Sequence, residues 1–119
     1  MEAIKLEGTY NVFGFRLSHR VLTLRRTFIV DEQYFNNDII FVAVQHINVA
    51  IDMNNILIRL ATQEEQIDIV SKGYFDVQYA NFLKIYMIES NDEGLKRDYF
   101  VVAAMIQIKE TYLAPIPLE

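Results

Sequence analysis

The sequence predicts a mainly β fold, an antiparallel sandwich or a partly open barrel of seven to nine strands, with room for one short helix near residues 62–73. Two observations predict it. Apolar residues recur with a period of two in several runs, as in 40–45, 56–61 and 102–109. The same runs are rich in β-branched and aromatic residues, which suit a pleated, half-buried surface. An α+β arrangement is the alternative.

Length and composition indicate one domain. The chain has 119 residues, of which 52% are hydrophobic, and a chain of this size buries enough apolar surface to fold without a metal or a disulfide. We therefore expect a single β-rich domain over residues 1–119. Within it, residues 112–119 are expected to form an extended C-terminal tail, because Pro115 and Pro117 cannot donate ladder hydrogen bonds.

Short loops between the apolar runs predict antiparallel pairing. The first hairpin must turn near Ser18–Arg20, because apolar residues are odd-numbered before that point and even-numbered after it. A similar change near His46 predicts a bulge or a bend. Residues 52–55 and 90–94 are expected to close two further hairpins. The expected strands are 3–8, 11–17, 21–29, 39–44, 47–52, 55–61, 82–89 and 98–109.

Segment 62–73 supports two interpretations. Thr62 and Glu65 have the spacing of a helix capping box, and Gly73 suits a helix C-terminus. Ile67 and Ile69 nevertheless alternate as in a strand, which is slightly favoured here. The aromatic stretch that follows, 74–82, carries no regular pattern.

Composition and charge exclude several function classes. The chain has no cysteine, so a disulfide, a thiolate nucleophile and a cysteine-ligated metal are excluded. Its net charge of −5 argues against general nucleic-acid binding, which depends on cationic contacts to phosphate. We see neither a secretory signal nor an apolar run long enough to cross a membrane, and expect a cytoplasmic protein that binds neither nucleic acid nor membrane.

Positive charge gathers near the start of this acidic chain. One interpretation is a solvated hairpin whose arginine stems cover apolar surface. The other is a contact surface for a carboxylate, a phosphate or an acidic protein, since the planar guanidinium makes paired hydrogen bonds to such groups. The candidate binding residues are Arg16, His19, Arg20, Arg25 and Arg26.

Catalytic signatures are missing from the sequence. His46 is the candidate for a pocket residue, aimed inward by the predicted bulge; the alternative is an ordinary histidine at the edge of the core. The two histidines have no metal-binding spacing, and the adjacent acidic pairs point apart on a strand. No nucleotide-binding or nucleophile motif is present. We therefore expect no catalysis, no cofactor and no metal.

Three stretches, "SHRVLTLRR", "DIIFVAVQHI" and "YFVVAAMIQIKE", resemble in pattern small single-domain β-rich bacterial proteins, among them immunity proteins of toxin systems. This resemblance implies a protein that binds another protein and catalyses nothing. The leading hypothesis is accordingly a non-catalytic protein–protein interaction of the immunity or adaptor type. The alternatives are a small-ligand carrier or modest enzyme with an internal pocket near His46, and a structural subunit that assembles with itself.

Overall fold

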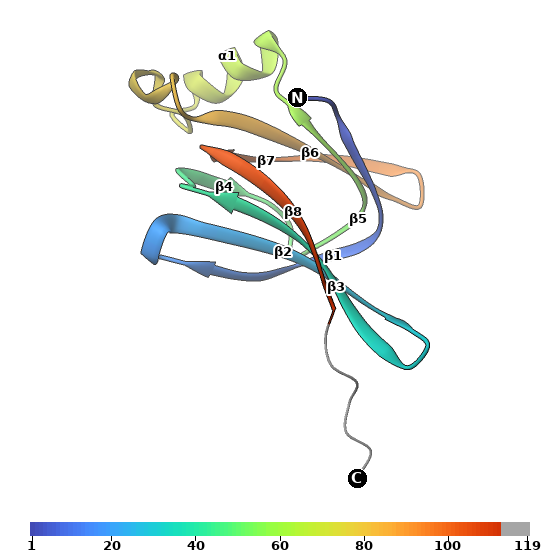
Figure 1. Ribbon diagram of the computed structural model, residues 1–119. Coiled ribbons are helices and arrows are strands. Elements are labelled where there is room, and N and C mark those ends of the chain that lie inside the picture. The colour runs from blue at the N-terminus through green and yellow to red at the C-terminus, as the bar shows by residue number, and fades with distance from the viewer. Residues whose placement is uncertain (113–119) are drawn as a thin grey trace.

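The computed structural model describes the backbone of residues 1–112 and the side chains of residues 1–110. It confirms a mainly β fold, in which eight antiparallel strands form one sheet (Figure 1). The strands are β1 (Ile4–Arg16), β2 (Val21–Val30), β3 (Gln33–Val42), β4 (His46–Asn48), β5 (Asp52–Leu60), β6 (Lys84–Asp92), β7 (Leu95–Ala103) and β8 (Met105–Tyr112). The helices are α1 (Gln63–Ser71) and two 3-10 turns, η1 (Ser18–Arg20) and η2 (Val77–Tyr79). Of the expected tail over 112–119, Tyr112 ends β8 and residues 113–119 lie outside the described part of the chain.

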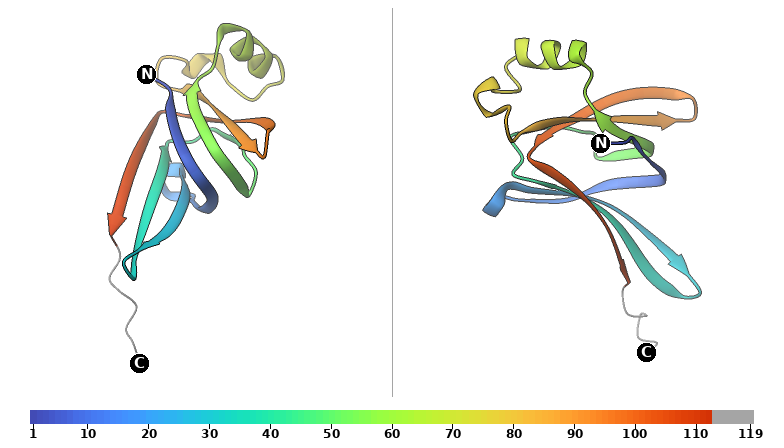
Figure 2. Two further views of the ribbon diagram at one scale, coloured as in Figure 1. Left: turned by 90° about the vertical axis from the view of Figure 1, so that its right-hand side faces the viewer. Right: turned by 45° about the horizontal axis from the view of Figure 1, so that its top comes forward.

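The strands follow the order β4-β7-β6-β5-β1-β2-β3-β8, and this order does not close on itself. At its two ends, β3 continues into β4 and β7 continues into β8 through short bends. β3 pairs with β8 while β4 pairs with β7, so the two bent chain segments run side by side. At the bends, the Ala104 amide donates to the Val42 carbonyl at 2.9 Å and the Gln45 amide donates to the Val102 carbonyl at 2.7 Å. The sheet therefore curls over as a partly open barrel (Figure 2).

The main core fills the inside of the curled sheet. Facing positions such as Leu24 and Ile39 on β2 and β3 are fully buried, as are Ile58 and Ile88 on β5 and β6. Apolar side chains from both halves of the sheet pack together there, and the core gathers Tyr10, Leu22, Leu24, Ile39, Phe41, Val44, Met53, Ile56, Ile58, Tyr86, Ile88, Val101 and Ala103. This packing explains the period of two, since alternate residues of each strand face the same core.

Helix α1 lies over the outer face of β6 and β7 (Figure 2), and a second, smaller core fills the space between them. The slight preference for a strand over 62–73 was wrong. Both halves of the capping box are present, with the Glu65 amide donating to Thr62 Oγ1 at 3.2 Å and the Thr62 amide donating to Glu65 Oε1 at 2.8 Å. Of the two alternating isoleucines, Ile69 is buried in this core while Ile67 is exposed. The caps therefore decided the structure of this segment.

One predicted turn is wrong, and the predicted hairpin at 90–94 is present with a shorter loop. Residues 52–55 close no hairpin, because β5 runs through them. Here the β1–β5 pairing shifts register, with Glu7 and Gly8 of β1 opposite Asn55 (φ 47°), whose side-chain oxygen accepts a hydrogen bond from the Gly8 amide at 3.0 Å. The loop at 90–94 is a two-residue turn over Glu93–Gly94, since Asp92 pairs with Leu95. The turn at Ser18–Arg20 and the break in pairing before His46 are confirmed.

Candidate functional site

The five predicted cationic residues do not form one cluster. Arg16, His19 and Arg20 lie exposed where β1 turns into β2, on the left in Figure 1. Arg25 and Arg26 lie further along β2, and as neighbours on a strand they point to opposite faces of the sheet. The structure therefore brings together three of the five.

Arg25 is satisfied within the protein. Its Nε and Nη2 donate to the two oxygens of Asp38, across the β2–β3 pair, at 2.7 and 2.8 Å. The bonds to the Asp38 carboxylate raise the pKa of Arg25 above its ordinary value. The same guanidinium lies 3.6 Å from the centre of the Phe13 ring. Arg25 therefore positions Phe13 and offers its paired donors to Asp38 instead of to a partner.

Arg26 belongs to the inner face, in line with the buried Leu22 and Leu24. Its guanidinium carbon lies 4.7 Å from the centre of the Phe28 ring. Its side chain also runs close to Gly8, where an added Cβ would lie 2.2 Å from the Arg26 Nε. Arg26 thus covers apolar surface inside the curled sheet. This matches the first interpretation of the basic residues, in which arginine stems cover apolar side chains.

The remaining cations belong to a surface that we call the basic tip, made of Phe13, Phe15, Arg16, Leu17, His19 and Arg20. Its apolar members are unusually open for their type: Leu17 is 85% exposed and Phe13 is 62% exposed. Neither Arg16 nor Arg20 forms an ion pair with any described residue. The tip therefore combines unpaired positive charge with exposed apolar side chains.

The backbone of the basic tip is strained and also leaves a strand edge open. His19 and Arg20 have φ angles of 63° and 49°, a left-handed conformation that costs a residue with a side chain about 1 kcal/mol. Pairing of β1 with β5 ends at Asn11, whereas pairing with β2 continues to Arg16. No strand within residues 1–112 therefore covers the outer edge of residues 13–16, and this edge is available for an added strand.

The other predicted site residue, His46, lies on the outer face of the sheet. Its ring stacks against Tyr74 with centres 4.5 Å apart and against Phe100 with centres 5.4 Å apart. Tyr74 comes from the aromatic stretch 74–82 that sequence patterns left unassigned. His46 lines neither of the two hollows described next, so its position corresponds to the core-edge interpretation.

One hollow of about 320 Å³ lies between α1, the segment after it and β6. Its walls are mostly apolar, with Gln66 and Lys84 as polar exceptions among Leu60, Val70, Phe75, Val77, Ala80, Leu83 and Ile85. The second hollow, about 370 Å³, lies over the register shift between β1 and β5. Its polar groups bond to one another: Asn54 donates to Asp92 and accepts from Thr9. Among the described residues, no cluster of three or more metal-ligating side chains occurs.

Comparisons with known proteins bring no relative to this site. No family model matches the chain, and neither the curated proteins nor the solved structures yield a significant match. The resemblance to immunity-type proteins therefore stays a prediction. Within the described residues, no helix has the length and apolar character needed to cross a membrane.

Proposed function

We propose that the protein binds another protein through its basic tip and has no catalytic role. The observation that carries this proposal is the combination of unpaired cations, exposed apolar side chains and an open strand edge in one place. Arginine and aromatic side chains supply much of the binding energy at protein interfaces. A cysteine-free, acidic chain is compatible with a cytoplasmic setting for this interaction.

Each part of the basic tip has a distinct use in such a complex. Arg16 and Arg20 would donate to carboxylates of an acidic partner, and the edge at 13–16 would add backbone hydrogen bonds to an extended segment. Phe13 and Leu17 would bury apolar surface against it. Because Arg25 and Asp38 already hold Phe13 in place, less conformational freedom is lost on binding.

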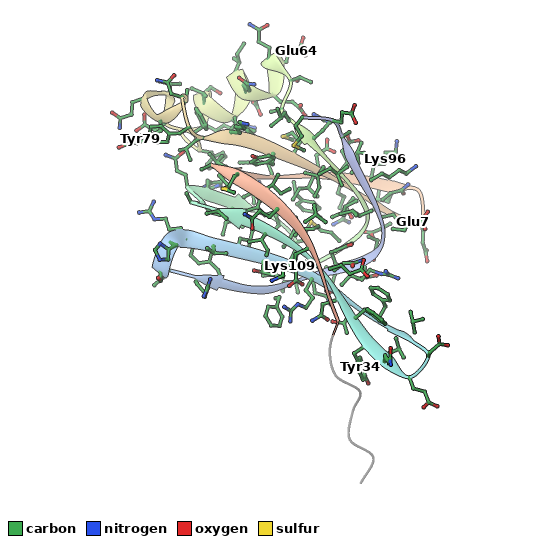
Figure 3. All side chains as sticks on the ribbon, viewed as in Figure 1. Glu7, Tyr34, Glu64, Tyr79, Lys96 and Lys109 are labelled. Atoms are coloured by element: carbon green, nitrogen blue, oxygen red, sulfur yellow. The ribbon has the colours of Figure 1, made fainter. Side chains whose placement is uncertain are left out.

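The test is native mass spectrometry of the protein gently purified from its own source. A stoichiometric companion protein should appear with the natural chain and be lost when Arg16→Glu and Arg20→Glu are combined. The control reverses two exposed cations elsewhere, Lys96→Glu with Arg97→Glu; Lys96 lies on the β6–β7 hairpin, away from the basic tip (Figure 3). A companion that survives the tip substitutions, or is lost equally with the control, contradicts the proposal.

A small-ligand carrier is the second candidate, and the apolar hollow beside α1 is the observation that favours it. This hollow lies outside the curled sheet, whose interior is filled by the main core. In the same experiment, a lone monomer with the extra mass of one small molecule would support the carrier. Loss of that mass on Val70→Trp, which would fill the hollow, would assign the ligand to it.

A further inference from the structure

The opposite end of β2 carries a second exposed tip, of opposite charge. Here Asp31 and Glu32 form a two-residue turn between β2 and β3, since Val30 pairs with Gln33. We call residues 29–32 the acidic tip. Both carboxylates are exposed and neither forms an ion pair with any described residue. The apolar neighbours are open too, and Ile29 is 60% exposed.

The conformation of this turn is unfavourable for Glu32, which stands at the position where such a turn favours glycine. Asp31 and Glu32 have φ angles of 50° and 63°, and a turn of this kind normally contains Asn-Gly or Asp-Gly. The turn between β6 and β7 follows that rule, with Gly94 at its second position. Strained residues with side chains cluster at functional sites, where the surrounding structure holds them in place. The two ends of β2 therefore share a feature, charged side chains where glycine would be relaxed.

The two tips complement one another. The basic tip presents Arg16 and Arg20 beside Leu17, while the acidic tip presents two carboxylates beside Ile29 and Val30. They lie at opposite ends of β2, whose ten residues span roughly 30 Å at about 3.3 Å each. Figures 1 and 2 show the β1–β2 turn and the β2–β3 turn pointing away from each other. A single chain therefore cannot join its own tips.

We propose that copies of this chain associate head to tail, with the acidic tip of one copy docked on the basic tip of the next. This inference rests on the proposed function, in that the basic tip is the binding surface, and it names the partner as a second copy. Symmetric pairing of two basic tips is disfavoured because it would bring four arginines together. A head-to-tail contact leaves one free tip of each kind, so it builds rings or filaments.

Charge reversal with the purified full-length chain tests the proposal. One variant combines Arg16→Glu with Arg20→Glu, and the other combines Asp31→Lys with Glu32→Lys. Sedimentation velocity across a concentration series should show the natural chain growing in mass, more so at low salt. Each variant alone should associate at least about tenfold more weakly, whereas an equimolar mixture of the two should assemble again. The chain with Lys96→Glu and Arg97→Glu should behave like the natural one.

Three results would overturn the inference. The first is a natural chain that stays monomeric up to about 1 mM, the weak limit of specific association. The others are a variant that assembles like the natural chain, and a mixture that stays monomeric while circular dichroism shows both variants folded. The proposed function fails separately. A natural chain that is monomeric alone but loses a foreign companion on Arg16→Glu with Arg20→Glu overturns head-to-tail association and leaves protein binding in place.

Discussion

The ion pairs around Glu65 make the stability of this protein depend on pH in a defined window. Arg59 Nη1 and Nη2 donate to the two oxygens of Glu65 at 2.6 and 3.0 Å, and Arg59 Nε donates to Glu89 at 2.8 Å. Hydrogen bonding from the Arg59 side chain lowers the pKa of Glu65 from 4.5 to about 2. This network links Glu65 in the first turn of α1 to Arg59 on β5 and Glu89 on β6.

The pKa of Glu65 sets the size and sign of the effect. A fall from 4.5 to about 2, at about 1.4 kcal/mol per pH unit, corresponds to about 3.5 kcal/mol as an upper limit. Because the Glu65 side chain is 25% exposed, water screens the pair and we expect about 1–2 kcal/mol. The folded pKa is the lower one, so this stabilisation is present above about pH 4.5 and is lost as the pH falls toward 2.

Glu65→Gln isolates this contribution, because glutamine at the third helical position still accepts the capping hydrogen bond. Urea unfolding followed by circular dichroism should show the natural chain more stable by about 1–2 kcal/mol at neutral pH, with the difference closing near pH 2. Glu64→Gln, at an exposed neighbouring position, is the control and should change little. A difference of equal size at both pH values, or none at neutral pH, would refute the reasoning.

Three further changes are checked by denaturant unfolding at neutral pH. Gly8→Ala should cost about 1–2 kcal/mol, because Gly8 has a φ of +93° and the methyl group, 2.2 Å from the Arg26 Nε, would push this side chain off the Phe28 ring. Gly73→Ala, at φ +80° in open space, should cost about 1 kcal/mol; a smaller cost for Gly8→Ala would contradict this. Glu32→Gly should stabilise by about 0.5–1 kcal/mol by relieving its left-handed φ, and a loss of stability would argue against strain there. Asp38→Ala should cost about 2–3 kcal/mol by leaving Arg25 without its paired acceptor, and an unchanged midpoint would show that the pair contributes nothing.

The strands that the sequence predicts well are those with apolar alternation. The strand predicted over 39–44 begins six residues too late, since β3 starts at Gln33, and this error has a physical cause. Residues 33–38 contain asparagine and aspartate, which are poor strand formers by composition. In the structure these polar side chains are satisfied across the β2–β3 pair: Thr27 donates to Asn36 at 2.8 Å, and Arg25 donates to Asp38. A single sequence does not show which residue stands opposite another.

The candidate site was only partly predictable for the same reason. The change of apolar parity correctly located the turn at Ser18–Arg20, and with it the cations of the basic tip. It did not separate Arg25 and Arg26 from that tip. Asp38, the partner of Arg25, becomes its neighbour only through the β2–β3 pairing. Phe28 is close to Arg26 by strand alternation alone, but that their shared face is the inner one depends on how the sheet curls. The acidic tip carried a faint signal, two acidic residues between apolar runs, but lacked the glycine that marks such a turn.

The sequence by itself determined the strand-rich class, the capping box that begins α1 and the crowding of positive charge near the start of the chain. These are local properties, set by side-chain periodicity, backbone preference and composition. The tertiary structure decided how the bends at 43–45 and Ala104 bring β3 beside β8, which arginines are satisfied internally and which stay exposed. Both the bends and the pairing of each arginine depend on the register between strands that are distant in the chain. This register either places a charged side chain opposite its counter-ion or leaves it at the end of a strand without a partner.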